Sequence, residues 1–153
     1  MIVVDASLAA KWVLWEADSR DALRFTLFPG RSLCGPDLLF TEVAGAIVKR
    51  ANMKKGIEAD ALEALRKWTI AWDDHIVKPH RVTQRRIYEA GKLALTLGHP
   101  LQDCIYLGLA MELSCELATC DEKFRAKALG IYPAVRLLHE FDLGDDGLLG
   151  TVS

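Results

Sequence analysis

Five short, mostly apolar runs, separated by longer segments of helical periodicity, constrain the fold of this chain more than any other feature of its sequence. We predict strands at these runs, which cover residues 1–4, 32–35, 75–79, 116–120 and 134–138. Parallel neighbours in a sheet need long crossover connections, which are usually helices, so this alternation is typical of a parallel sheet covered by helices. The sequence therefore predicts an α/β protein with three layers, α/β/α, and a mainly parallel central sheet.

The connections between these runs carry apolar residues at helical spacing. Helices are predicted over residues 6–16, 21–28, 36–56, 58–72, 83–97, 100–114 and 122–129. Ser7 is expected to cap the first helix, on which Leu8, Trp12 and Trp15 are spaced to share one face. Pro36 is expected to open the third helix, because proline is favoured in a first helical turn.

The length of 153 residues suits a single domain with a sizeable core. We predict one domain over residues 1–140 and an acidic, glycine-rich tail over 141–153, which we expect to be loose or dependent on a partner for its order. Acidic and basic residues nearly balance, with a formal net charge of -2 and a pI of about 6.1. Bulk charge gives no support to a nucleic-acid partner, so such a role must depend on a local basic patch.

The sequence is expected to encode a cytoplasmic protein. Asp5 interrupts the first apolar run and no basic segment precedes it, so no signal peptide is predicted. No apolar stretch approaches the length of a membrane span. The cysteines, at positions 34, 104, 115 and 120, are irregularly spaced and include no C-x-x-C pair, which favours reduced, mostly buried thiols over disulfides or a zinc site.

Four acidic residues stand out because their neighbours in the sequence are apolar. Asp5 and Asp121 follow predicted strands, whereas Glu42 and Asp103 stand near the beginnings of apolar helices. The carboxyl ends of parallel strands lie along one edge of the sheet, where ligands bind in α/β proteins. Four carboxylates brought together there would raise one another's pKa, and a divalent cation with oxygen ligands, such as Mg²⁺ or Mn²⁺, removes this repulsion. We therefore predict a metal site formed by these residues.

The same acids are also compatible with simpler roles and with different chemistry. An acid in a first helical turn, such as Asp103, interacts favourably with the helix dipole, and Glu42 alone is compatible with a solvated helix face. An aspartyl-phosphate phosphatase, or a non-enzymatic, receiver-like Mg²⁺-binding module, would also place an Asp at the end of the first strand. The phosphatase usually needs a second Asp two residues later, where this chain has Ser7, and the receiver-like module leaves Glu42 without a role.

The segments around the four acids resemble the PIN domain, specifically the VapC-type toxin ribonucleases of type II toxin–antitoxin systems. The segments are VVDAS, PDLLFTEVAGAI, HPLQDCIYLGLAMEL and LATCDEKF, and the resemblance covers residues 1–138. Thr119 and Phe124 complete a T-x-D-x-x-F motif around the last acid. Some members carry a further acid just beyond it. Here Glu122 is adjacent to Asp121 and the next residue is Lys123, so the sequence does not match those members at the further acid. A complete second metal site is therefore not predicted.

The resemblance implies that residues 1–140 form a PIN-like nuclease domain with a Mg²⁺- or Mn²⁺-dependent endoribonuclease activity that hydrolyses RNA phosphodiester bonds. It assigns the catalytic and metal-binding roles to Asp5, Glu42, Asp103 and Asp121. Ser7 and Thr119 would hold a metal-bound water or a phosphate oxygen, and ordinary helix and turn capping is the alternative role for both.

The partners implied by the resemblance are an RNA substrate, a cognate antitoxin that inserts Arg or Lys among the carboxylates, and a second copy of the chain in a homodimer. Candidate contacts to the RNA backbone are Lys11, Lys49, Arg50, Arg85 and Arg86, with Lys54, Lys55 and Arg81 nearby. For any single one of these, a solvated helix face is the simpler explanation. The helical spacing of the four tryptophans favours packing in the core or a dimer over stacking on bases.

Overall fold

Five parallel strands form one central sheet in the computed structural model, which describes residues 1–54 and 56–144. The strand order is β3-β2-β1-β4-β5, and every neighbouring pair is parallel. The strands are β1 (Ile2–Val4), β2 (Leu33–Pro36), β3 (Lys78–His80), β4 (Glu116–Thr119) and β5 (Val135–Leu137). Each overlaps one of the predicted runs, so the predicted α/β fold with a parallel central sheet is confirmed.

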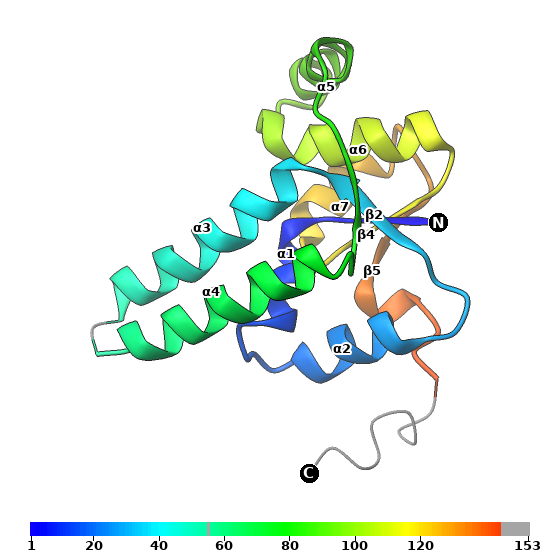
Figure 1. Cartoon of the computed structure of the whole chain (residues 1–153). Coiled ribbons are helices and arrows are strands. Elements are labelled where there is room, and N and C mark those ends of the chain that lie inside the picture. The colour runs from blue at the N-terminus through cyan, green and yellow to red at the C-terminus, as the bar shows by residue number, and fades with distance from the viewer. Residues whose placement is uncertain (55, 145–153) are drawn as a thin grey trace.

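Helices cover the sheet and one helical hairpin extends beyond it (Figure 1). They are α1 (Ala6–Ala9), the 3₁₀ helix η1 (Ala10–Trp12), α2 (Ser19–Leu27), α3 (Leu38–Met53), α4 (Glu58–Asp73), α5 (Gln84–Leu97), α6 (Leu101–Leu113), α7 (Glu122–Ala128) and the 3₁₀ helix η2 (Leu138–Glu140). α6 packs against β1, β2 and β4, and α5 covers the outer side of α6. α3 and α4 lie side by side as the hairpin, with α1 next to α3.

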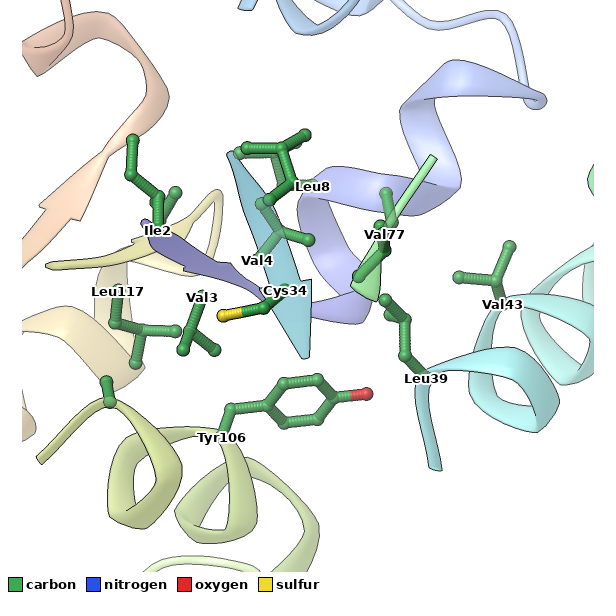
Figure 2. Close-up of a cluster of buried hydrophobic side chains, with 14 of the residues drawn as sticks. Ile2, Val3, Val4, Leu8, Cys34, Leu39, Val43, Val77, Tyr106 and Leu117 are labelled. Atoms are coloured by element: carbon green, nitrogen blue, oxygen red, sulfur yellow. The ribbon is translucent and has the colours of Figure 1, made fainter. Parts of the chain in front are cut away.

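The first strand lies at the centre of the core, because β2 and β4 pair with it on either side. Val3 and Val4 are fully buried. Successive residues of a strand face opposite sides of the sheet. Figure 2 accordingly shows Val3 directed toward Tyr106 of α6 and Val4 directed toward Leu8 of α1. A strand covered on both faces must be apolar throughout, which explains the continuous run at the start of the chain.

The first helix is shorter than predicted. α1 ends at Ala9 and passes into η1, and its N-cap is Asp5 rather than Ser7, since the Asp5 side chain accepts a hydrogen bond from the Leu8 backbone N–H. The indole of Trp12 donates to the Ala22 carbonyl at 3.0 Å, which holds η1 against α2 and turns the chain. Trp15 therefore leaves the predicted apolar face and is 70% exposed.

The other tryptophans pack in an aromatic cluster, as their spacing predicts. Trp68 lies 6.4 Å from Trp12 and 5.8 Å from Trp72, measured between ring centroids, and Phe40 lies 5.0 Å from Trp72. The cluster joins the α3–α4 hairpin to η1. Trp68 is fully buried, and its indole donates to the Phe40 carbonyl at 2.9 Å.

The start of the third helix also differs from the prediction. Pro36 is the last residue of β2, and α3 begins at Leu38 with Asp37 as its N-cap. The backbone N–H of Asp37 donates to the His80 carbonyl at 2.8 Å, which extends the β2–β3 pairing past the proline. Proline is tolerated at this end of the strand because no ladder hydrogen bond is required of its nitrogen.

The described part of the predicted tail, residues 141–144, lies against the domain. The Phe141 ring contacts Phe25 in an edge arrangement at 5.1 Å, and Arg31 donates to the Asp142 carbonyl. The remaining residues of the predicted tail, 145–153, lie outside the described residues. Among the described helices, none combines the length and the hydropathy that crossing a bilayer requires.

Candidate functional site

Asp5 is a buried carboxylate at the carboxyl end of the central strand. Its side chain is 3% exposed, yet both of its oxygens have donors. Ser7 Oγ donates to Oδ1 at 2.7 Å and the Leu8 N–H donates to the same oxygen at 3.2 Å, while Thr119 Oγ1 donates to Oδ2. A buried charge is tolerated only with such partners, so these contacts explain why an apolar strand can end on an acid.

Two hydroxyl groups connect Asp5 to the end of β4. Ser7 Oγ lies 3.2 Å from Thr119 Oγ1 and accepts a hydrogen bond from the Cys120 N–H at 2.9 Å. Thr119 Oγ1 accepts from the Asp121 N–H at 3.0 Å. Ser7 and Thr119 therefore position the Asp5 carboxylate and fix the loop that carries Asp121. Thr119 thus has the turn-capping role that the sequence left open for it, whereas Ser7 caps no helix and instead joins the ends of two strands.

Asp121 caps the helix that follows it. Its Oδ1 accepts a hydrogen bond from the Phe124 N–H at 3.0 Å, which makes it the N-cap of α7. The T-x-D-x-x-F motif thus has a structural explanation. Its threonine donates a hydrogen bond to Asp5, its aspartate caps α7, and its phenylalanine, Phe124, is fully buried.

Glu42 lies on α3 and is oriented by a tyrosine from α6. The Tyr106 hydroxyl donates to Glu42 Oε1 at 2.6 Å. Tyr106 is itself almost fully buried beneath the sheet, with its hydroxyl at the edge of the core (Figure 2). Burial raises the pKa of Glu42, the Tyr106 hydrogen bond lowers it, and the negative charge of Asp103 raises it further.

Asp103 lies in the first turn of α6 and is paired with a histidine four residues earlier, in the loop before that helix. The distance between His99 Nε2 and Asp103 Oδ2 is 2.6 Å. His99 also stacks on Phe124 of α7, with 5.0 Å between ring centroids. This histidine therefore joins the Asp103 carboxylate to the helix that Asp121 caps.

The charge of Asp103 acts on two of the other predicted acids, Asp5 and Glu42. Burial raises the pKa of Asp5 from its ordinary value of 3.8 to about 6, against the lowering effect of its hydrogen bonds, and the charge of Asp103 adds to the rise. Burial also raises the pKa of the Tyr106 hydroxyl, and the nearby charges of Glu42, Asp5 and Asp103 act in the same direction. The charges of Asp5, Glu42 and Asp103 thus all act on the hydroxyl of Tyr106, which donates its hydrogen bond to Glu42. Asp121 is connected to Asp5 through Thr119.

The chemistry of these side chains fits a divalent cation. Carboxylates that raise one another's pKa are stabilised by a positive charge, and hard cations such as Mg²⁺ prefer oxygen ligands. As they stand, no three His, Cys, Asp or Glu side chains in the described part of the chain lie close enough together to hold a metal ion. Mg²⁺ usually keeps several water ligands and needs only one or two carboxylates, so binding through water is compatible with this spacing. The assignment of the four acids as ligands stays a prediction.

A groove of 870 Å³ runs from this group of acids along α3. Ser7, Glu42 and Cys120 line one end, and small residues of α1, η1 and α3 form its walls. Three of the predicted RNA-binding residues, Lys11, Lys49 and Arg50, line the groove together with Lys54. Lys55 lies outside the described residues.

The other two predicted RNA-binding residues belong to a different surface. Arg85 and Arg86 lie in the first turn of α5 and line hollows that contain none of the four acids. Arg86 is paired with Glu112 at 2.7 Å. The structure therefore brings three of the five predicted RNA-binding residues to the groove and leaves the other two on the α5–α6 side.

Two polar residues of the site, His99 and Tyr106, were not singled out from the sequence. His99 precedes Asp103 by four residues, the spacing at which helical neighbours meet. Tyr106 lies three residues after Asp103, on the same side of α6. This spacing, applied around each acid, would have found both. Their contacts with α3 and α7 come from the tertiary fold.

Comparisons with known proteins place the chain among relatives of similar fold. Residues 2–129 match the PIN domain family. A structure described as a toxin–antitoxin complex from Klebsiella pneumoniae superposes with a TM-score of 0.65 at 15% identity, covering 90% of this chain and 98% of that one. VapC20 from Mycobacterium tuberculosis, described as a toxin that cleaves the sarcin–ricin loop, has a TM-score of 0.65 at 16% identity and covers 82% and 94%. No curated protein matches the sequence.

Proposed function

The chain belongs to the PIN domain family, and from this premise we propose that it is a Mg²⁺- or Mn²⁺-dependent endoribonuclease that acts as the toxin of a toxin–antitoxin pair. The observation that carries the proposal is the group of carboxylates around Tyr106. Asp5, Glu42 and Asp103 come from three different elements, and burial and mutual charge raise the pKa of two of them. Stored repulsion of this kind is typical of functional sites that bind a cation.

The side chains have distinct roles in this proposal. Asp5, Asp103 and Asp121 would hold the metal directly or through water, and Glu42 would bind through water or orient the attacking water molecule. A bound divalent cation supplies charge stabilisation at the phosphate and lowers the pKa of a coordinated water. Tyr106 and His99 act as positioning residues, because each holds one oxygen of an acid and leaves the other oxygen available.

The RNA strand would approach along the groove beside α3. Lys49 lies seven residues after Glu42, which corresponds to about 10 Å along the helix axis. Cations at that distance from the acids can hold the sugar–phosphate backbone beside the scissile phosphate, and they do so without reading the base sequence. VapC20, one of the two similar structures, is described as a toxin that cleaves the sarcin–ricin loop, which supports RNA as the substrate class. In this proposal the chain acts in the cytoplasm.

The alternative of an aspartyl nucleophile has less support in this site. A phosphatase or a receiver-like module needs an accessible aspartate oxygen to accept a phosphoryl group. Asp5 is buried, and both of its oxygens accept hydrogen bonds. Ser7, at the position where such phosphatases carry their second Asp, is one of these donors. Glu42 and its tyrosine would also have no part in that chemistry.

Metal-dependent cleavage of RNA by the purified chain tests the proposal. We expect cleavage in Mg²⁺ or Mn²⁺, no cleavage in a chelator, and a loss of at least about a hundredfold in Asp103→Asn, the range for removal of one charge-stabilising group. Asp60→Asn is the matched control, because Asp60 is also an acid in a first helical turn, on α4. Full activity in chelator, or in Asp103→Asn, would exclude the metal mechanism.

The proposal includes an antitoxin that covers the acids. A cationic side chain inserted among Asp5, Glu42 and Asp103 would relieve their repulsion in place of the metal. We expect the chain alone to arrest growth and the product of the neighbouring gene to restore it and to form a stable complex. Growth arrest that persists in the presence of that product, with the complex formed, would contradict inhibition at this site.

A further inference from the structure

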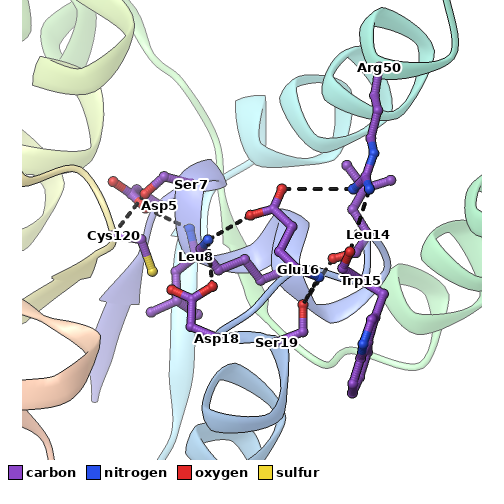
Figure 3. A network of polar contacts seen from close by, with 11 residues as sticks. Asp5, Ser7, Leu8, Leu14, Trp15, Glu16, Asp18, Ser19, Arg50 and Cys120 are labelled. Carbon is purple, nitrogen blue, oxygen red and sulfur yellow. Dashed lines mark hydrogen bonds and ion pairs between the residues drawn. The ribbon is translucent and has the colours of Figure 1, made fainter. Parts of the chain in front are cut away.

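Two cations of the groove, Lys11 and Arg50, are already paired with carboxylates of the chain itself. Lys11 Nζ lies 2.7 Å from Glu16 Oε2 and 2.7 Å from Asp18 Oδ1. The other oxygen of Glu16 lies 3.8 Å from Arg50 Nη1. Figure 3 shows the Glu16 side chain between the Asp5–Ser7 group and Arg50, inside the region that the groove occupies.

The loop that carries Glu16 is held in place by a buried serine. Ser19 is fully buried, and its hydroxyl accepts from the Glu16 N–H at 2.8 Å and donates to the Leu14 carbonyl at 3.0 Å. Arg50 adds a longer contact from Nη2 to the Trp15 carbonyl at 3.5 Å. These contacts fix the turn that directs Glu16 toward the two cations.

Lys11 and Arg50 differ from the other cations of the groove because they are paired with carboxylates. Lys49 and Lys54 line the same groove and have no ion pair among the described residues. Burial lowers the pKa of Lys11, but its hydrogen bonds to Asp18 and Glu16 raise it by more, so the ammonium group stays charged. The groove thus contains charged lysines and an arginine together with one bidentate anion, Glu16, whose two oxygens each face a cation.

We propose that Glu16 is an internal substitute for a substrate phosphate: it holds Lys11 and Arg50 in the free protein and is displaced when the backbone of a single-stranded RNA enters the groove. The inference rests on the proposed ribonuclease function and extends it to the way the substrate binds. A phosphodiester has two non-bridging oxygens, as the carboxylate does, and carries the same charge. Binding of RNA therefore exchanges one anion for another at these cations, and the exchange weakens the affinity.

Neutral variants of Glu16 test this. Binding of a short fluorescein-labelled single-stranded RNA is measured by anisotropy in chelator, where cleavage is not expected. Glu16→Gln is expected to lower the Kd by roughly 1.5- to fivefold at low salt, the range for loss of one competing surface charge. The plot of log K against log salt is expected to become steeper by about 0.7 for each further phosphate that the cations neutralise. Asp18→Asn is expected to change the Kd in the same direction by a smaller factor.

Glu63→Gln is the matched control. Glu63 is paired with Arg66 on α4 at 2.6 Å and is 49% exposed, close to the 44% of Glu16, but it does not line the groove. Equal tightening in Glu63→Gln would mean that net charge alone acts, and would overturn the proposal. In a Lys11→Met, Arg50→Met background, the effect of Glu16→Gln should disappear. If Glu16→Gln still tightens RNA binding in that background, the proposal is also overturned.

Cleavage of the same RNA separates this inference from the proposed function. If the wild-type chain with Mn²⁺ does not cleave RNA, the proposed function fails whatever Glu16 does. If the wild type cleaves and Glu16→Gln changes neither Kd nor KM while remaining folded by thermal denaturation, only the inference fails. If Glu16→Gln binds a glutamate-rich peptide more tightly but not RNA, the groove takes an acidic protein partner, and the proposal is likewise wrong.

Discussion

Thr119 donates its hydroxyl hydrogen to Oδ2 of Asp5, a residue 114 positions earlier in the chain. The two residues follow neighbouring strands, because Val4 of β1 lies opposite Ala118 of β4. The same threonine oxygen accepts from the Asp121 N–H. One hydroxyl thus joins the carboxyl ends of both strands and the loop of a further predicted ligand.

Replacement of this hydroxyl should affect both stability and activity. Thr119→Val keeps the shape of the side chain but leaves the buried Asp5 carboxylate without one donor, which is expected to cost about 1–3 kcal/mol of the free energy of unfolding. The hydrogen bond lowers the pKa of Asp5, so its loss also disfavours the ionised ligand. Urea denaturation and RNA cleavage measure the two effects. Thr119→Ser, which keeps the donor, should retain most of the stability and most of the cleavage activity. Equal losses in Thr119→Val and Thr119→Ser would contradict this role.

The raised pKa of Asp5 predicts how the stability of the metal-free protein depends on pH. The folded-state pKa of about 6 lies above the ordinary 3.8, so the folded state binds this proton more tightly than the unfolded state. The contribution to stability is complete below about pH 4 and is lost as the pH rises through 6, a change of roughly 3 kcal/mol for two pKa units. Urea denaturation in chelator across this range measures it.

The Asp5→Asn variant isolates this effect from other titrating groups. An amide does not ionise, so the difference between wild type and variant should vary with pH in the window just described. Divalent metal, added above pH 7, should stabilise the wild type and have much less effect on the variant. A difference that stays constant from pH 4 to pH 7 would show that Asp5 is not protonated preferentially in the folded state.

Much of the fold could be predicted because its strands are short and bounded by clear signals. Thr83 caps α5 through a hydrogen bond from the Arg86 N–H, and Gly98 ends it in the left-handed region at a φ of 60°. Both ends agree with the sequence prediction. The first helix was predicted too long, because the apolar spacing of Trp12 and Trp15 continues past the point where the Trp12 indole binds Ala22. Helical periodicity carries no information on such a tertiary contact.

The candidate site was predictable as a set of acids but not as a network. Apolar neighbours marked the four acids, and parallel topology placed their elements at one edge of the sheet. Nothing in the spacing of Glu42 and Tyr106, 64 positions apart, indicates that they share a hydrogen bond. The ion pairs of Lys11 could not be predicted either, because the sequence does not show whether a carboxylate lies beside a basic residue in the fold.

Tyr106→Phe should weaken the position of Glu42 without disturbing the core. The change removes only the hydroxyl, and Glu42 is half-buried, so the expected cost is about 1 kcal/mol of the free energy of unfolding. Glu42 would lose the contact that lowers its pKa. A double-mutant cycle with Glu42→Gln, measured by urea denaturation and by the rate of RNA cleavage, isolates the pair. Additive effects on both quantities would mean that the two side chains do not act together.

The homodimer stays a prediction, and the outer face of α5 is our candidate interface. Ile87, Tyr88 and Leu95 are apolar and exposed there, and Leu95 is 87% exposed. Leu95→Lys should shift the chain from dimer to monomer in sedimentation at micromolar concentration, because a buried, unpaired lysine opposes association. Leu62→Lys on α4, at a residue that is also exposed, is the control. If the wild type is a monomer, the predicted homodimer is wrong. If only the control variant Leu62→Lys dissociates, the interface lies elsewhere than on α5.

The central place of β1 has a consequence for the making of the protein. During synthesis β1 must wait for β4, residues 116–119, before its second neighbour is present, and Asp5 must wait equally for Thr119. Pairing over such a separation is slow compared with local folding. A nascent chain therefore carries Asp5 without the threonine that fixes its second oxygen until β4 has been synthesised, and the buried carboxylate is assembled only after residue 119 has been added.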